Sequence, residues 1–245
     1  MIFYEKIIIF PKISREVNKN VESVHLQFLT EKFDLTIDKD KCVGCGVCSR
    51  ICPKEAIVKK ILDEPIRFKG KQIIKKIKHY LIPFVRDPNT CVYCGTCTYL
   101  CPFDALRLTV NNQVIEPDQL PVVLKKALPK LDYEIKKLDS GKTAKVYTSG
   151  SITIDTNKCA GGCTNCAQAC PTGAIKATVK GDPNDYNAEV LLEIYDDKCI
   201  FCGTCWHACP TSALTLIIDK VKYSGEYTDP FWPTIVEKLK LKKRI

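Results

Sequence analysis

The sequence predicts an α+β protein made of two tandem modules of short strands and short helices, preceded by an N-terminal β-hairpin. Two observations carry this prediction. Sixteen cysteines among 245 residues fall into four tight groups, and a proline follows the last cysteine of every group. Around each group the same order recurs, namely a short alternating strand, a polar turn, the cysteines and a second short strand.

The cysteine groups share the spacing C-x2-C-x2-C-x3-C-P. It occurs at residues 42–53, 91–102 and 199–210, and a version one residue longer occupies 159–171 as C-A-G-G-C-T-N-C-A-Q-A-C-P. This spacing resembles that of bacterial-type ferredoxins, in which soft thiolates hold iron–sulfur clusters. The four motifs therefore predict four [4Fe-4S] clusters as the cofactors.

Two other metal chemistries are less consistent with the motifs. Zinc sites usually appear as two separated C-x2-C pairs, which differ from uninterrupted quartets ending in Cys-Pro. The third motif opens with the C-x3-C-x2-C spacing of radical S-adenosylmethionine enzymes. However, a fourth cysteine follows it, and no stretch of the chain is long enough for that family's barrel. We interpret the third motif as an ordinary cluster motif with a one-residue insertion at Gly161-Gly162.

The gaps between motifs predict how they pair. There are 38 residues between the first and second motifs, 28 between the third and fourth, and 57 between the second and third. We expect an N-terminal extension at 1–20, a first module at 21–116 with a basic insert at 59–81, a linker at 117–143, a second module at 144–223 and a C-terminal basic tail at 224–245. Residues 24–28 and 33–37 are expected to form the hairpin. Helices are expected in the insert, packed on its own module, in the Lys-rich stretch 124–137 and at 231–241.

The charge of the chain gives no indication of nucleic-acid binding. The formal net charge is +9, with 26 Lys/Arg against 17 Asp/Glu in residues 1–150 and 11 against 11 in the remainder. Each oxidised cluster with four thiolates carries about −2, so four clusters add roughly −8. No apolar run approaches the roughly 18 residues of a membrane span. We expect a cytoplasmic protein of a reducing, anaerobic cell with no membrane span.

The resemblance to two-cluster ferredoxins also implies which cysteines share a cluster. In those proteins the first three cysteines of a motif hold one cluster and the fourth holds the other. The implied ligand sets are Cys42, Cys45, Cys48 and Cys101 for cluster 1; Cys91, Cys94, Cys97 and Cys52 for cluster 2; Cys159, Cys163, Cys166 and Cys209 for cluster 3; and Cys199, Cys202, Cys205 and Cys170 for cluster 4.

A narrower resemblance concerns the second motif. Residues 92–108, V-Y-C-G-T-C-T-Y-L-C-P-F-D-A-L-R-L, and the hairpin before the first motif resemble the polyferredoxin subunits of archaeal formylmethanofuran dehydrogenases. Those subunits often carry more than four motifs, so this chain would be a shortened relative. The resemblance implies electron transfer in methanogenesis, to or from tungsten- or molybdenum-containing catalytic subunits. Ferredoxin, hydrogenase or heterodisulfide reductase would be the electron donor.

Several alternatives stay open at this level. The chain also resembles polyferredoxins of hydrogenase or heterodisulfide reductase complexes. The four-cluster subunit of the dimethyl sulfoxide reductase type would pair its motifs in nested order, and an iron–sulfur redox sensor would need an output domain. We find no paired acid and base and no nucleotide-binding loop, so we expect no catalytic site. His25 and His207 are expected to be packed or solvent-facing, and Tyr93, Phe201 and Trp206 to shield clusters.

Overall fold

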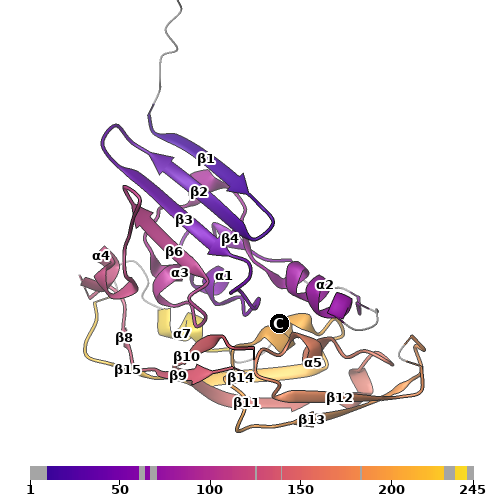
Figure 1. Cartoon of the computed structure of the whole chain (residues 1–245). Coiled ribbons are helices and arrows are strands. Elements are labelled where there is room, and N and C mark those ends of the chain that lie inside the picture. The colour runs from indigo at the N-terminus through magenta and orange to yellow at the C-terminus, as the bar shows by residue number, and fades with distance from the viewer. Residues whose placement is uncertain are drawn as a thin grey trace, which may run out of the picture.

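The computed structural model describes residues 10–60, 64–66, 71–124, 126–138, 140–182, 184–228 and 235–241. The strands are β1 (Lys12–Val17), β2 (Val21–Gln27), β3 (Lys32–Asp38), β4 (Ile57–Val58), β5 (Phe84–Val85), β6 (Leu106–Val110), β7 (Gln113–Val114), β8 (Lys130–Leu131), β9 (Glu134–Lys137), β10 (Thr143–Val146), β11 (Thr148–Ile154), β12 (Ile175–Lys180), β13 (Glu189–Ile194), β14 (Leu214–Val221) and β15 (Tyr223–Ser224). The helices are α1 (Val47–Ile51), α2 (Lys71–Leu81), α3 (Thr96–Tyr99), α4 (Pro121–Leu124), α5 (Asn165–Ala169), α6 (Thr204–Ala208) and α7 (Ile235–Leu239). Figure 1 shows the first module's sheet above, the second module's long hairpins below, and short helices between them.

Strand pairing confirms two tandem modules. In the first, β3 pairs with β6 and β4 pairs with β5, so the strand before the first motif lies beside the strand after the second. In the second module β11 pairs with β14 and β12 with β13 in the same arrangement. Apolar residues face each other in equivalent places, with Ile37 opposite Leu106 and Ile154 opposite Leu214. Each module is therefore closed by contacts between its two motifs.

The predicted hairpin is present as β2 and β3, but the sheet around it is larger than expected. Strand β1 pairs antiparallel with β2 along its whole length, from Lys12 opposite Gln27 to Val17 opposite Glu22. The sheet has the order β1-β2-β3-β6-β7. Residues 12–17, expected in an extension, therefore form part of the first module's sheet. Their side chains are mostly exposed, so an apolar alternation that would have indicated a strand is absent from this segment.

The predicted helix at 124–137 is wrong. The described part of this stretch contains β8 and β9, and β9 pairs with β10 around a turn at Gly141. Strand β8 pairs with β15 near the C-terminus. Pro129 interrupts the run and lacks the N–H that a helix interior requires. The strand partner of residues 130–131 lies at residues 223–224, which no local pattern in the linker indicates.

The helix predicted in the insert is present as α2, but it packs differently than expected. Ile77 and Leu81 are fully buried and form a small core with Ala208 of α6 and Ala169 of α5. Both partners belong to the second module. Leu81 also lies against Gly44 in the first motif. The insert therefore joins the two modules and does not simply cover its own.

The two modules share one apolar core. Ile37, Leu106 and Leu108 of the first module belong to the same buried cluster as Tyr147 and Ile200 of the second. Helix α7 adds Ile235 and Leu239 to this core, and the backbone of Leu241 exchanges hydrogen bonds of 3.0 and 2.7 Å with Ile218. Of the helix predicted at 231–241, residues 231–234 lie outside the described residues. No helix within the described residues has the length and apolar character needed to cross a bilayer.

Candidate iron–sulfur sites

Each cysteine motif folds into a loop followed by a helical turn. The third cysteine lies within that helix, as Cys48 in α1, Cys97 in α3, Cys166 in α5 and Cys205 in α6. The fourth cysteine stands at or just beyond the helix end. Because proline follows it, its backbone is driven out of the helical region, and Cys52 is extended with φ −64° and ψ 117°. The Cys-Pro pair thus ends each helix and turns the fourth thiol away from its own loop.

A left-handed turn within each motif brings backbone N–H groups to the sulfurs. Two residues after the first cysteine, Gly44, Tyr93 and Phe201 have φ between 50° and 78°. The Phe201 N–H donates to Cys199 Sγ at 3.4 Å. Further on, the N–H groups of Ala105 and Ala213 donate to the sulfurs of the fourth cysteines at 3.3 and 3.2 Å. Such N–H···S bonds stabilise thiolate charge and influence the reduction potential of a bound cluster.

The cysteines gather in four groups that cross the motif boundaries, and we name them quartets A to D. Their members are Cys42, Cys45, Cys48 and Cys101 (quartet A); Cys52, Cys91, Cys94 and Cys97 (quartet B); Cys159, Cys163, Cys166 and Cys209 (quartet C); and Cys170, Cys199, Cys202 and Cys205 (quartet D). Each quartet contains the cysteines that the resemblance to two-cluster ferredoxins implies for one cluster, and their role as the ligands of that cluster stays a prediction.

Electrostatics shows how closely the members of a quartet approach one another. The pKa of the Cys42 thiol is raised to about 12, mainly by burial, with the nearby Cys101 contributing to the rise. Burial likewise raises the pKa of Cys97 well above its usual range, with Cys94, Cys91 and Cys52 adding to the rise. A neighbouring thiolate raises the pKa of each of these thiols, because two like charges repel each other.

The same pattern holds in the second module. The pKa of Cys166 is raised to about 12, mainly by burial, with Cys163 and Cys209 contributing to the rise. The pKa of Cys202 is raised to about 11, mainly by burial, with Cys170 and Cys199 contributing. In both modules the fourth cysteine of a motif therefore acts on the quartet started by the neighbouring motif.

The quartets fit a multi-iron cluster. Every quartet crowds four thiols together and includes at least one that is buried, and such thiols ionise together only when a bound metal compensates their charge. Quartet B lines one cavity and quartet D lines another, so their thiols border a common space. Among the described residues, no three His, Cys, Asp or Glu side chains are close enough to hold a single metal ion. Thiols arranged around a space are what a [4Fe-4S] cluster requires, since it takes one thiolate at each iron.

The inserted residue of the third motif has a definite role in packing. The Gly162 N–H donates to the Ala188 carbonyl at 3.0 Å. A Cβ at Gly161 would lie 2.0 Å from the Tyr186 carbonyl oxygen. The longer loop therefore packs directly on the connection between β12 and β13.

Replacing Gly161 by alanine is expected to loosen quartet C. The Tyr186 backbone must move, and overpacking of this kind costs about 1–3 kcal/mol. We expect iron release to a chelator to become about tenfold faster for one cluster of the four, since 1.4 kcal/mol is about a factor of ten. The release phases of the other three clusters provide an internal control. Equal acceleration of all four phases, or of none, would contradict this assignment.

The aromatic and histidine side chains singled out in the sequence are placed as follows. Tyr93 is buried and its ring lies 6.3 Å from that of Phe33. The Trp206 ring contacts that of His207 in a tilted arrangement, with ring centroids 4.6 Å apart and an angle of 59° between the ring planes. His207 is buried, and its Nε2 would lie 2.6 Å from a Cβ at Gly46, so it packs across the boundary between the modules.

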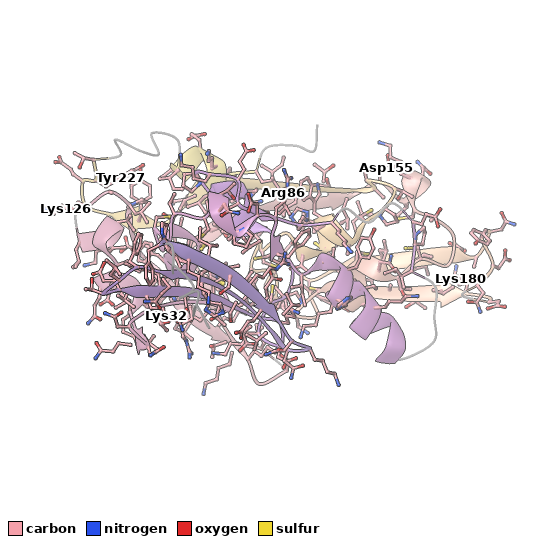
Figure 2. All side chains as sticks on the ribbon, turned by 90° about the horizontal axis from the view of Figure 1, so that it is seen from above. Lys32, Arg86, Lys126, Asp155, Lys180 and Tyr227 are labelled. Atoms are coloured by element: carbon pink, nitrogen blue, oxygen red, sulfur yellow. The ribbon has the colours of Figure 1, made fainter. Side chains whose placement is uncertain are left out.

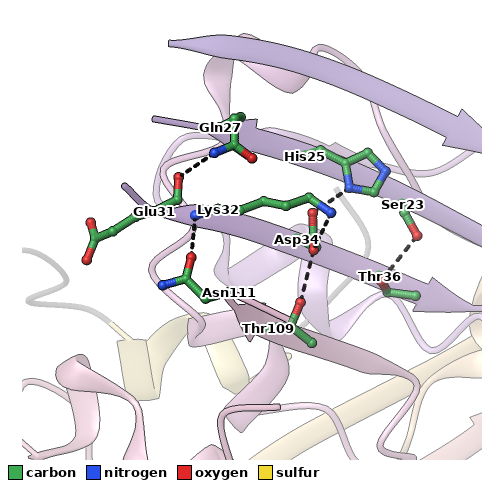
Figure 3. A network of polar contacts seen from close by, with 9 residues as sticks. All are labelled: Ser23, His25, Gln27, Glu31, Lys32, Asp34, Thr36, Thr109 and Asn111. Carbon is green, nitrogen blue, oxygen red and sulfur yellow. Dashed lines mark hydrogen bonds and ion pairs between the residues drawn. The ribbon is translucent and has the colours of Figure 1, made fainter. Parts of the chain in front are cut away.

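His25 is part of a polar network on the first module's sheet. Its Nδ1 lies 2.5 Å from Asp34 Oδ1, and Thr109 donates to the other carboxylate oxygen at 3.2 Å (Figure 3). Lys32 Nζ completes the group at 3.2 Å from Asp34. Burial raises the pKa of Asp34, whereas the hydrogen bonds with His25 and Lys32 lower it, and the net shift is downward. The network joins β2, β3 and β6 and contains no cysteine.

Sequence reasoning missed the contact between the two modules. Cys45 of quartet A and Cys202 of quartet D are close enough for the charge of one to act on the other. A Cβ at Gly203 would lie 3.7 Å from the Cys45 carbonyl oxygen. Beside them, Arg50 and Tyr147 border a small cavity together with Cys202. No spacing in the sequence indicates that the first and fourth motifs meet.

Comparisons with known proteins agree with this arrangement. Residues 41–105 and 158–214 each match a family model described as a 4Fe-4S dicluster domain. A ferredoxin of Methanothermococcus thermolithotrophicus is 36% identical over 67 residues, which are 27% of this chain and 97% of that protein. NADH-quinone oxidoreductase subunit I of Pelobacter propionicus is 33% identical over 75 residues, which are 29% of this chain and 40% of that protein. F(420)H(2) dehydrogenase subunit I of Methanosarcina mazei is 50% identical over 40 residues, 16% of this chain and 22% of that protein.

One solved structure matches nearly the whole fold. It is a chain of the formate dehydrogenase, heterodisulfide reductase and formylmethanofuran dehydrogenase complex from Methanospirillum hungatei, with a TM-score of 0.72 and 24% identity. The match covers 95% of this chain and 92% of that one. It shows that the arrangement of both modules occurs in another protein.

The fold and the four quartets define an iron–sulfur protein of the electron-transfer class, with four [4Fe-4S] clusters in two dicluster domains. The chain belongs to the 4Fe-4S dicluster ferredoxin family. Because it joins two such domains in one chain, it is a polyferredoxin.

Proposed function

We propose that this polyferredoxin is the electron-transfer subunit of an oxidoreductase complex of the formylmethanofuran dehydrogenase type. The observation that carries the proposal is the similarity to a chain of the Methanospirillum hungatei complex, which extends over both modules and their connection. A ferredoxin domain alone would account for only one module. The partners would be the catalytic subunits of such a complex, and the chain itself would bind no substrate.

The quartets supply the ligands in this proposal. Each of quartets A, B, C and D would hold one cluster through its four thiolates, and each bound cluster exchanges one electron. The proposal is supported by the effect of Cys101 on Cys42 and by that of Cys52 on Cys97. The protein's contribution is to keep the thiolates dry, to donate N–H groups to their sulfurs and to hold neighbouring quartets together.

The quartets follow a spatial order that differs from their order in the chain. Cys48 of quartet A and Cys97 of quartet B act on each other's charge, and Cys205 of quartet D and Cys166 of quartet C do the same. With the contact between Cys45 and Cys202, the order becomes B, A, D, C. We propose that electrons enter and leave at the outer quartets, B and C.

The surroundings of the outer quartets support this assignment. Next to quartet B, the side chain of Val92 is 53% exposed. Next to quartet C, Tyr186 is 76% exposed and its backbone lies against Gly161. Asp155 and Lys180, which belong to the second module, lie at the end of the molecule opposite Lys126 (Figure 2). By contrast, all four cysteines of quartet A are buried.

The proposed division of the chain follows the quartets. Residues 21–116 and 144–223 form the two modules, the first extended by β1, and residues 117–143 connect them. Residues 224–245 form a tail, of which α7 packs against α1 and β14. A cytoplasmic location is proposed because free thiolates require a reducing compartment.

Anaerobic purification from native cells is the test of this function. We expect about sixteen iron and about sixteen sulfide per chain, four of each per quartet, and co-purification with subunits that carry a molybdenum or tungsten centre. Two clusters' worth of iron, or stoichiometric zinc, would contradict the cofactor assignment. A cluster-replete chain that co-purifies with a different catalytic subunit would contradict the complex and leave the electron-transfer role intact.

A further inference from the structure

Arg50 lies where the two modules meet. It occupies the last turn of α1, between Cys48 and Cys52 of the first motif. Its Nε and Nη1 atoms are buried and have no hydrogen-bond partner among the described residues. A guanidinium has five N–H donors, no acceptor and a permanent positive charge. Arg50 as a whole is half-buried, but burying part of a charged group without a partner is costly, so the two buried nitrogens indicate an anionic neighbour.

The groups around Arg50 come from both modules. After burial, which lowers its pKa, the strongest influences on Arg50 are Cys45, Tyr147, Cys48 and Cys202, all of which raise it. Two of these cysteines belong to quartet A and one belongs to quartet D. The strongest electrostatic partners of this cation are therefore thiols and a phenol, where a structural arginine would have a carboxylate.

A small cavity beside Arg50 is lined by residues of both modules. Arg50 and Val47 of α1 line it on one side, and Tyr147, Phe201 and Cys202 line it on the other. The Tyr147 hydroxyl faces the first module and donates to the Leu100 carbonyl at 2.6 Å. Two of the three guanidinium nitrogens, Nε and Nη1, are therefore shielded from solvent between the modules, where charge–charge interactions are stronger than in water.

Other lysines near the quartets act on one quartet each. Lys142 acts on Cys42 of quartet A, and Lys136 acts on Cys199 of quartet D. Both are at least partly solvated, so water and salt weaken their influence. Arg50 is also only half-buried as a residue, but it differs from them because its Nε and Nη1 atoms are shielded from solvent and because it acts on both quartets.

We propose that Arg50 is a counter-ion shared by quartets A and D and that its charge raises the reduction potentials of the two clusters held there. The inference rests on the proposed ligand sets and on the order B, A, D, C. Uptake of one electron, without a proton, makes a site more negative by one charge, and a nearby fixed cation stabilises that state. Burial by itself disfavours added negative charge, but the cation keeps quartet A, whose four cysteines are all buried, reducible.

The test is a potentiometric titration of the complete chain with dithionite, followed by electron paramagnetic resonance. Replacing Arg50 by glutamine removes the charge and keeps a hydrogen-bonding side chain. We expect two of the four one-electron steps to become about tenfold less favourable, which corresponds to about 59 mV toward more negative potential. The other two steps are expected to stay within a third of that shift. The Arg50→Lys variant keeps the positive charge, so we expect its potentials to shift by at most half as much as those of the Arg50→Gln variant.

Two controls separate charge from packing. Arg107→Gln removes an exposed positive charge from β6 of the same module, and it should leave all four steps unchanged. Arg50→Met retains an apolar stem of similar length and is used if the glutamine variant binds fewer than four clusters. Loss of clusters in both neutral variants, but not in Arg50→Lys, would also support a required cation.

Three results would overturn the inference. These are unchanged potentials in a neutral variant with about sixteen iron, an equal shift of all four steps, and cluster loss in the lysine variant as well as the neutral ones. Iron and sulfide analysis of the unaltered chain keeps this inference separate from the proposed function. If the unaltered chain lacks four clusters, the ligand sets fail. If it has them and the potentials do not respond, only the role of Arg50 fails.

Discussion

Replacing Cys52 and Cys91 together by serine is expected to remove one cluster, whereas replacing Cys52 and Cys42 together is expected to remove two. Both double variants lack two thiols of the first module. In the first variant both thiols come from quartet B, and in the second variant one comes from each of quartets A and B. The expected iron content is about twelve per chain for the first and about eight for the second, from about sixteen in the unaltered chain.

This pair of variants tests whether the motifs exchange their fourth cysteines. If each motif held its own cluster, the two results would be reversed, because Cys52 and Cys42 would then share a site. The measurement is iron and acid-labile sulfide per chain after anaerobic purification. Cys170 with Cys199, compared with Cys170 with Cys159, repeats the experiment in the second module. Loss of all four clusters in either double variant would show instead that the modules do not assemble independently.

The exchange has a structural consequence. In the proposed ligand sets Cys101 joins Cys42 and Cys52 joins Cys91, so the two bound clusters would tie the first and second motifs together. Metal binding contributes directly to folding free energy in small domains. Each module is therefore closed twice, by strand pairs such as β3–β6 and β4–β5 and by its two clusters.

The Gly44→Ala variant is expected to lower the free energy of unfolding by about 2–5 kcal/mol. Gly44 has φ +78°, and a Cβ there would lie 2.5 Å from the Leu81 Cβ and 2.9 Å from the Leu81 carbonyl oxygen. A left-handed backbone costs a non-glycine residue about 1–2 kcal/mol, and overpacking adds about 1–3 kcal/mol. The affected contact is the one that seats α2 between the modules.

Gly141→Ala is the matched control for this variant. Gly141 has φ +77°, almost the same conformation, but a Cβ added there would have no heavy atom within 4 Å. We expect a loss of about 1–2 kcal/mol from the backbone alone. Because cluster loss is irreversible, bleaching of the visible iron–sulfur absorbance against denaturant is the appropriate measurement, compared at one incubation time. Equal effects of both variants would mean that α2 can move away from a Cβ at position 44 with no additional loss of stability.

Much of the fold and of the sites follows from local sequence. The quartet spacing, the proline after each fourth cysteine and the short strands on either side are read directly from the chain, and the structure has strands at all eight predicted flanking places. These features are local because a cluster needs thiolates on a tight loop, and because proline after Cys52 or Cys170 restricts the residue before it. The insert helix was predictable for a similar reason, since its apolar residues recur at helical spacing.

Other elements could not be derived from local patterns. Strand β1 has mostly exposed side chains, and β8 depends on a distant partner, since Leu131 pairs with Tyr223. Helix α2 was expected to pack on the first module, whereas it contacts α5 and α6 of the second. Its apolar stripe indicates that one face is buried, but it does not identify the residues that cover this face. In each case the missing information is the identity of a distant neighbour.

The sequence by itself determined that this chain holds four clusters in two tandem modules, because ligand type and spacing are chemical requirements of the cofactor. Only the tertiary structure decided that the quartets lie in the order B, A, D, C and that Arg50 stands between the inner two. The physical reason is that Arg50 is one of three non-cysteine positions between Cys48 and Cys52, and nothing beside it in the chain indicates that its Nε and Nη1 atoms are shielded from solvent. Its role depends on Cys202, which packing between the modules brings to it.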